Sequence, residues 1–253
     1  MSMKPLEFDR HYGELDQVIS AYAGLAADDT PELPGRALTA YLRHTWHTRP
    51  WALAVAEQQL RTYARNPPGR LRLRLGEFYP VPDIGLPEAE IQQWLLVLAD
   101  HVKQSIEEGR VPPPAALPET HWEWHARFPE LGQFLGGWFS QDMPSEFDDH
   151  EAAVGDYADS ADPTLVARLV GEVRALLALG LEEVDYAVGI AELGMEVDLP
   201  APYAPSAWLA VVAEQLARFR PDYGQGGQGV PGAPSGSGRP GPGEPAQPPD
   251  AIR

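Results

Sequence analysis

The chain of 253 residues contains no cysteine, which excludes disulfide bonds and thiolate metal sites and is typical of a bacterial cytosolic protein. No run of about 18 apolar residues occurs, so we expect no membrane span. Residues 1–9 lack a basic region followed by an apolar one and therefore predict no secretion signal. Together these absences predict a cytoplasmic protein.

The motifs of common active sites are also missing. We find no glycine-rich phosphate loop, no Gly-x-Ser-x-Gly elbow, no calcium loop and no cysteine nucleophile. His121 and His125 share a helical face, as the two histidines of a zinc helix do. In a zinc helix, however, a glutamate directly follows the first histidine, whereas Glu123 comes two residues after His121. These residues, like His44 and His47, favour packing, with a metal or functional site as the alternative. The sequence predicts no enzyme, no metal and no cofactor.

Basic residues are few, and they are unevenly distributed along the chain. The formal net charge is −18. Residues 1–126 hold 17 acidic and 12 basic residues, whereas residues 127–220 hold 17 acidic and only 5 basic ones. Such a field repels nucleic acid and attracts basic proteins. The acidity therefore predicts a basic partner and no direct nucleic-acid binding, unless it serves solubility alone.

Proline and glycine, by contrast, are concentrated at two boundaries. Residues 221–253 contain 9 glycines and 8 prolines, and they cannot bury enough apolar surface to offset the entropy of ordering. We expect this tail to be disordered. Residues 111–120 form a second, proline-rich connector. The predicted organisation is a domain over 1–110, a linker over 111–120, a domain over 121–220 and a tail over 221–253.

The two predicted domains resemble each other. Residues 12–22 align with residues 128–138, with identical Glu, Leu and Gln at three positions and aromatic residues at both ends. Trp94-Leu-Leu-Val-Leu-Ala99 matches Trp208-Leu-Ala-Val-Val-Ala213 in the same order. We interpret the chain as two divergent copies of one helical unit, which is fewer than a solenoid array requires.

Helical periodicity dominates both copies. The helix after Asp162-Pro163 has a capping residue, a proline at its first position and a leucine-rich apolar stripe, and Gly180 is expected to end it. The other expected helices cover 11–25, 35–47, 51–64, 87–107 and 181–193, together with one from near 128 and one from near 206. Residues 70–75 alternate like a strand, but the repeat favours a helix there. The predicted fold class is all-α.

The stretch Phe128-Pro-Glu-Leu-Gly-Gln-Phe-Leu-Gly-Gly-Trp-Phe-Ser-Gln-Asp142, followed by acids and a leucine-rich helix, resembles the start of a contact-dependent growth inhibition (CDI) immunity protein. The resemblance covers about 127–218 and reaches 11–108 only through the internal repeat. It implies a small cytosolic protein that blocks a delivered toxin, often a nuclease. The first copy has Leu25-Ala26 where the Gln-Asp pair would align, which puts a binding role for that copy in doubt.

The acidic segment that follows this stretch is the predicted partner-binding site. It has no Lys or Arg between Gln141 and Pro163, and its carboxylates suit Lys or Arg side chains of a partner. The alternative is a solvated surface whose acids cap helices. The predicted partner-binding residues are Asp142, Glu146, Asp148, Asp149, Glu151, Asp156 and Tyr157.

These features predict an immunity protein that binds and neutralises a cognate basic toxin domain. The alternative is a non-enzymatic all-α scaffold or regulator that uses the same acidic face on a non-toxin partner. A neighbouring gene for a large secreted protein with a variable C-terminal domain would favour immunity.

Overall fold

The computed structural model describes residues 5–65 and 84–218, and every regular element in those two ranges is a helix. The all-α prediction is therefore confirmed over the described residues. The chain divides at Phe219 into two units, and the second unit, residues 220–253, lies outside them. The same holds for residues 70–75, so neither the strand-like pattern there nor the predicted disorder of the tail is tested. No described helix is long and apolar enough to cross a membrane.

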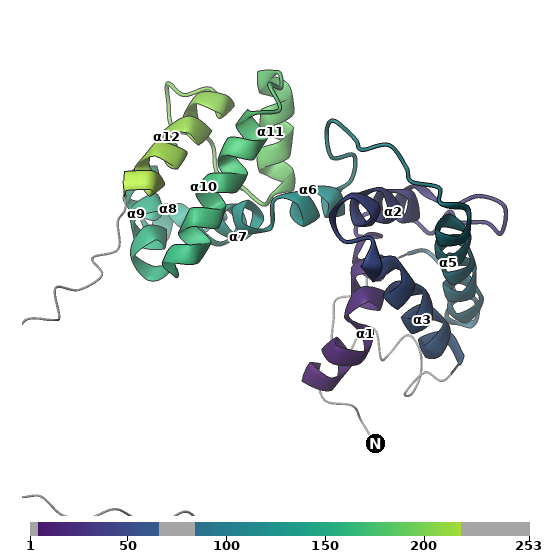
Figure 1. Ribbon diagram of the computed structural model, residues 1–253. Coiled ribbons are helices and arrows are strands. Elements are labelled where there is room, and N and C mark those ends of the chain that lie inside the picture. Colours follow the sequence, from purple (N-terminus) through teal and green to yellow (C-terminus); the bar gives the residue numbers. More distant parts are fainter. Residues whose placement is uncertain (1–4, 66–83, 219–253) are drawn as a thin grey trace, which may run out of the picture. The chain divides into compact units, whose positions relative to one another are not determined.

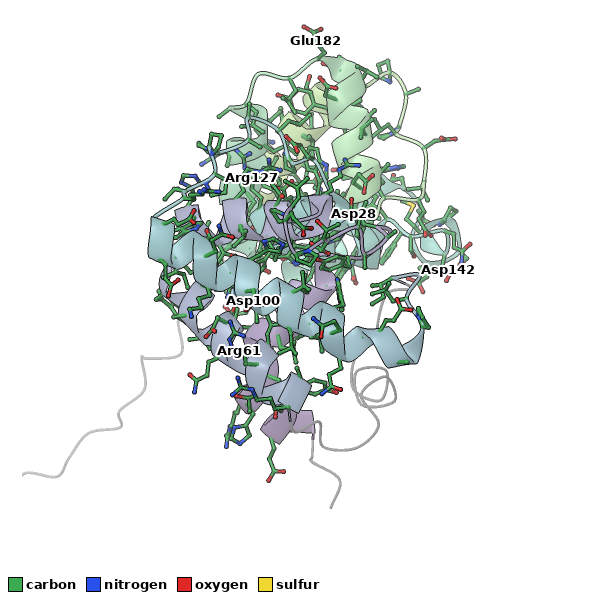
Figure 2. The ribbon with its side chains drawn as sticks, turned by 90° about the vertical axis from the view of Figure 1, so that its right-hand side faces the viewer. Asp28, Arg61, Asp100, Arg127, Asp142 and Glu182 are labelled. Carbon is green, nitrogen blue, oxygen red and sulfur yellow. The ribbon has the colours of Figure 1, made fainter. Side chains whose placement is uncertain are left out.

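The N-terminal half is built from four described helices: α1 (Pro5–Ser20), α2 (Arg36–Thr48), α3 (Trp51–Arg65) and α5 (Glu88–Glu108). Figure 1 shows α3 and α5 side by side, and α1 also packs on α3. Their facing sides bury one hydrophobic cluster that includes Leu15, Tyr22 and Leu95. On the outside of the same pair, Arg61 of α3 donates to Asp100 of α5 at 2.8 Å (Figure 2).

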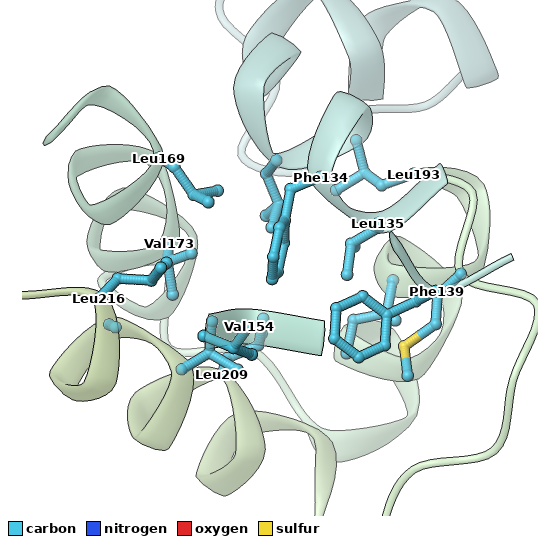
Figure 3. Packing of buried hydrophobic residues seen from close by; sticks show 14 of the residues in the cluster. Phe134, Leu135, Phe139, Val154, Leu169, Val173, Leu193, Leu209 and Leu216 are labelled. Carbon is cyan, nitrogen blue, oxygen red and sulfur yellow. The ribbon is translucent and has the colours of Figure 1, made fainter. Parts of the chain in front are cut away.

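The C-terminal half follows a short helix, α6 (His121–Arg127). Its helices are α7 (Pro129–Trp138), α8 (Met143–Glu146), α9 (His150–Ser160), α10 (Pro163–Leu177), α11 (Glu183–Glu192) and α12 (Pro205–Arg218). They bury a second cluster, in which Phe134, Phe139 and Leu209 meet residues of α9 and α10 (Figure 3). The aromatic face predicted for residues 128–139 is thus in the core.

Local sequence signals account for both ends of α10. The Asp162 carboxylate accepts a hydrogen bond from the Thr164 N–H at 2.7 Å, with Pro163 at the first position of α10, as predicted. Gly180 follows that helix at φ +63°, a left-handed conformation that favours glycine. The first helix differs most from its expected range, 11–25. It starts at Pro5, has non-helical angles at Tyr12 and ends at Ser20, where i to i+3 hydrogen bonds form a turn instead.

Equivalent helices of the two halves pack in the same pairs. In the first half α3 contacts α1 and α5, and in the second α10 contacts α7 and α12. Each half also has a corresponding hydrogen bond between two of these helices. The Leu15 N–H donates to Gln59 Oε1 of α3 at 2.9 Å, and the Leu131 N–H donates to Glu172 Oε2 of α10 at 2.9 Å. Both leucines occupy the same position of the sequence repeat, so these contacts support the tandem-copy hypothesis, which stays a proposal.

Helix α6 contributes to both hydrophobic clusters. Trp122 is packed in the first cluster and Trp124 in the second. The buried Glu123 between them accepts two hydrogen bonds from Arg43 of α2, both at 2.9 Å. The predicted boundaries of the linker and the two domains stay predictions. Helix α6 is nevertheless fixed to α2 by an ion pair and to α7 by packing.

Candidate partner-binding surface

The predicted acidic segment folds into α8, α9 and the turns around them. Asp142 directly precedes α8, Glu146 is its last residue, and Asp148 lies in the turn before α9. All three carboxylate side chains are exposed, and Asp142 can be seen in Figure 2. Apolar residues of the segment anchor it, since Met143 and Val154 are buried in the second cluster. The segment therefore presents acids to solvent from a backbone that is held by the core.

Two of the predicted residues, Asp149 and Glu151, lie where α9 begins. The Asp149 carboxylate caps α9 by accepting a hydrogen bond from the Ala152 N–H at 2.8 Å. The backbone carbonyl of Glu151 accepts a hydrogen bond from the Gln215 side chain of α12 at 3.2 Å. The exposed carboxylate of Glu151 takes no part in that bond. The start of α9 is thus tied to α12, and its two carboxylates border the line where these helices meet.

A groove of about 360 Å³ lies at this meeting of α9 and α12. We call it the acidic groove. Its rim carries Asp149, Glu151 and Glu214, and Arg218 is the one Lys or Arg among the lining residues that the structure describes. Its inner wall is apolar, because Val154, Trp208 and Val212 line it while each is at most 2 % exposed. Tyr203, an exposed aromatic residue in the loop before α12, borders the groove as well.

Asp156 and Tyr157 belong to another side of α9. Five residues along an α-helix correspond to a rotation of about 140°, so Asp156 points away from Glu151. Its carboxylate accepts a hydrogen bond from Trp138 Nε1 of α7 at 2.9 Å. Tyr157 is only 5 % exposed and packs edge-to-face on Phe134 and Trp138. Burial, with Glu130 and Glu172 nearby, raises the pKa of Tyr157 to about 12. Tyr157 is therefore a core residue in this structure, although the sequence analysis placed it among the partner-binding residues.

The groove also contains residues that sequence reasoning missed. Val211, Glu214, Gln215 and Arg218 lie on one face of α12 at i, i+3, i+4 and i+7 spacing. That spacing was visible in the sequence as a face of the helix next to the one that carries Trp208, Leu209 and Val212. What the sequence did not supply was the contact of this face with α9, about 60 residues earlier in the chain.

The histidines singled out in the sequence have structural partners. His121 Nδ1 lies 3.0 Å from a carboxylate oxygen of Glu192, and His125 Nε2 donates to the Glu192 carbonyl at 2.9 Å. Both contacts tie α6 to α11. Within the described ranges, no group of three or more His, Cys, Asp or Glu side chains is placed to hold a metal ion.

The described chain is thus an all-α protein whose C-terminal half carries an acid-rimmed groove. Residues 127–216 match the family model described as CdiI immunity protein. The match begins at the last residue of α6 and ends within α12, so it contains every described lining residue of the acidic groove except Arg218. No curated protein and no solved structure matches the chain. This match supports a role in toxin immunity in general terms.

Proposed function

We propose that this protein neutralises a cognate antibacterial toxin domain by binding it stoichiometrically through the acidic groove. The observation that carries the proposal is the coincidence of the family match with the half of the chain that holds the groove. Binding requires no catalytic group of the immunity protein, so the proposed role is not that of an enzyme. Immunity of this kind acts where a delivered toxin acts, which we take to be the cytoplasm.

The groove suits a Lys or Arg side chain of the toxin. Such side chains bury an apolar stem while their charged ends stay near polar groups. Trp208 and Val212 offer the apolar wall, and the carboxylates of Asp149 and Glu151 can accept charge-assisted hydrogen bonds. Tyr203 adds an exposed ring at the edge, and aromatic residues are enriched in interface cores. Arg218 hydrogen-bonds Glu214 at 3.4 Å, so we expect a basic partner to compete with it.

Long-range charge supports a basic partner as well. Residues 127–220 carry 17 acidic and 5 basic residues, and a field of this sign accelerates association with a positively charged protein. Toxins that act on nucleic acid need positive surfaces to bind the phosphate backbone. A nuclease toxin would therefore be blocked by an acidic surface that occupies its substrate site, without any contact between the immunity protein and nucleic acid.

In the N-terminal half, the carboxylate of Asp29 makes its hydrogen bonds within the fold. Asp29 accepts hydrogen bonds from the Tyr22 hydroxyl at 2.6 Å, from Trp94 Nε1 at 3.1 Å and from the Gly35 N–H at 2.7 Å. This carboxylate is thus engaged within the fold, whereas Asp148 and Glu151 project into solvent. We infer that the first half is a divergent copy that supports the second half and does not itself bind the toxin.

A cell-protection assay tests the function and the site separately. The toxin to test is the variable C-terminal domain of any large secreted protein that is encoded beside this chain, and it is expressed together with the full chain. We expect the wild-type chain to restore growth. The double variant Glu151→Lys/Glu214→Lys should lose most protection, and Glu90→Lys, a single exposed acid reversed on α5 of the first half, should keep it.

The outcomes distinguish three conclusions. Failure of the wild-type chain to protect would contradict the immunity role and favour the alternative scaffold role. Protection by wild type and by the double variant would contradict the groove but not the function. Because Asp149 caps α9, its own charge is tested with Asp149→Asn, which keeps the capping hydrogen bond and removes the charge.

A further inference from the structure

A second cavity, of about 470 Å³, lies at the C-terminal end of α2. It is lined by Arg43, His44 and His47 of α2, by Arg49 directly after that helix, and by Glu123 and Arg127 of α6. Prolines of the segment before α6 close one side, among them Pro114 and Pro118. Its volume is within the usual range of small-molecule pockets. We call it the cationic pocket.

The walls of this pocket are held by buried contacts. Trp122, next to Glu123 on α6, is 6 % exposed and packs edge-to-face on His44 with ring centroids 5.4 Å apart. Glu123 pairs with Arg43 at 2.8 Å, and its carboxylate also accepts from the Glu119 N–H at 2.8 Å. The pocket is therefore a built cavity between α2 and α6, because the two helices that line it are fixed to each other.

The charge balance of the lining is opposite to that of the chain. Three arginines face one carboxylate in the lining of a protein with net charge −18. Two of these arginines already have carboxylate partners: Arg43 pairs with Glu119 and Glu123, and Arg49 pairs with Glu14 at 2.7 Å. Arg127 has neutral partners instead, since it donates to the Ala116 carbonyl at 3.3 Å and lies 5.4 Å from the centre of the Phe128 ring. Its charge is not balanced by these partners.

The pKa of His44 is affected by the same positive charges. Burial is the largest cause that lowers the pKa of His44 to about 4, and the positive charges of Arg49 and Arg127 lower it further. The imidazole is therefore neutral at neutral pH. An anion in the pocket would oppose the two arginines and favour the protonated imidazole, which would then donate a hydrogen bond to it. The remaining charged groups in the lining are Arg43 and Glu123, which neutralise each other.

We propose that the cationic pocket between α2 and α6 binds a small ligand carrying a phosphate or carboxylate group, with Arg127 as its main charge partner. A guanidinium group offers two parallel N–H donors that match the geometry of both oxyanions. This site is separate from the acidic groove. It would bind a ligand of opposite charge to the groove's partner, and it would do so in the absence of any toxin.

The test is an NMR titration of the full chain, with the histidine rings isotopically labelled and His44 assigned by its loss in His44→Asn. Inorganic phosphate and citrate are added separately at constant ionic strength and neutral pH. We expect at least one of them to move the His44 signal saturably and to raise the pKa of His44. Arg127→Gln should weaken this binding by about tenfold, the loss expected when a charged donor is removed. Arg174→Gln, which removes an exposed arginine of α10 outside the pocket, should leave it unchanged.

The two probes also identify the ligand chemistry. Saturation by phosphate alone supports a phosphate-bearing ligand, saturation by citrate alone supports a carboxylate-bearing one, and mutual competition supports one site for both. The proposal is overturned if neither probe produces a saturable shift, or if Arg127→Gln binds as tightly as wild type. Because no toxin is present in this experiment, its outcome is independent of the immunity assay.

Discussion

Gly189 of α11 provides a direct test of the contact between α6 and α11. A Cβ atom built at this position would lie 2.6 Å from Cη2 and 2.8 Å from Cζ3 of Trp124. Ordinary contacts of a Cβ atom are 3.4 to 4 Å, so Gly189→Ala forces the indole to move. Trp124 is 3 % exposed in the second hydrophobic cluster, and it has little space into which to move.

The expected change in stability is a balance of two opposed effects. Replacing glycine by alanine within a helix stabilises it by up to about 1 kcal/mol. Overpacking of a filled core costs about 1 to 3 kcal/mol. We therefore expect Gly189→Ala to lower the free energy of unfolding by about 1 to 2 kcal/mol. Gly171→Ala in α10 is the matched control, since its Cβ would meet nothing within 4 Å and its site is exposed. That variant should raise the free energy of unfolding by about 0.5 to 1 kcal/mol.

Urea denaturation of the full chain, followed by circular dichroism at the helix band, measures both variants. Their midpoints should move in opposite directions with unchanged slopes. If the midpoints of Gly189→Ala and Gly171→Ala both rise, Trp124 does not pack against Gly189 as described. The contact that joins α6 to the second cluster would then be wrong.

Three further predictions use the same denaturation assay. Glu123→Ala should lower the free energy of unfolding by about 3 kcal/mol, because it leaves Arg43 (13 % exposed) without its buried partner. Glu119→Ala, at a 55 % exposed carboxylate, should lower it by less than about 1 kcal/mol. Similar losses in the two variants would contradict the buried pair. Burial raises the pKa of Glu172, so the stability conferred by its protonated form is lost as pH rises through the pKa of the folded state. Glu172→Gln should therefore raise the urea midpoint at neutral pH but not in acid. A variant that is destabilised at neutral pH would refute this. Asp149→Ala should destabilise by about 1 kcal/mol through loss of the α9 cap, and Asp149→Asn should not; equal effects would mean that the cap does not matter.

Much of the fold could be predicted from the sequence because its signals are local. The expected helices at 35–47, 51–64 and 87–107 correspond to α2, α3 and α5 with ends displaced by no more than one residue. Apolar periodicity also identified the aromatic face of Phe128–Phe139, which the core of the second half buries. Both depend only on which residues recur every three or four positions, and that information is present in a single helix.

The candidate site was predictable only in part, because it depends on contacts between distant segments. The exposed acids from Asp142 to Glu151 follow from composition and from the apolar residues between them. The partners of Tyr157 do not, because only the packing of α7 against α9 brings its ring into contact with Phe134 and Trp138. The same reason explains why Tyr203 and Glu214 were missed, since neither lies near the acidic segment in the sequence.

The cationic pocket shows the same limit. His44 and His47 were noted in the sequence as aromatic-rich packing residues near a helix end. Their approach to Arg127 requires α6 to pack on α2, about 80 residues away in the chain, and the Arg43–Glu123 pair holds that approach. Charge composition could not indicate this pocket, because the acidic total conceals a local excess of arginine.

Calorimetric titration of the purified toxin domain into the full chain tests the central claim most directly. We predict one toxin bound per chain, with an affinity that falls as salt concentration rises. The double variant Glu151→Lys/Glu214→Lys should bind about 10- to 100-fold more weakly, as expected for reversed charges facing a basic partner, while Glu90→Lys should bind like wild type. No heat of binding, or equal affinity and salt dependence in all three proteins, would contradict neutralisation through the acidic groove.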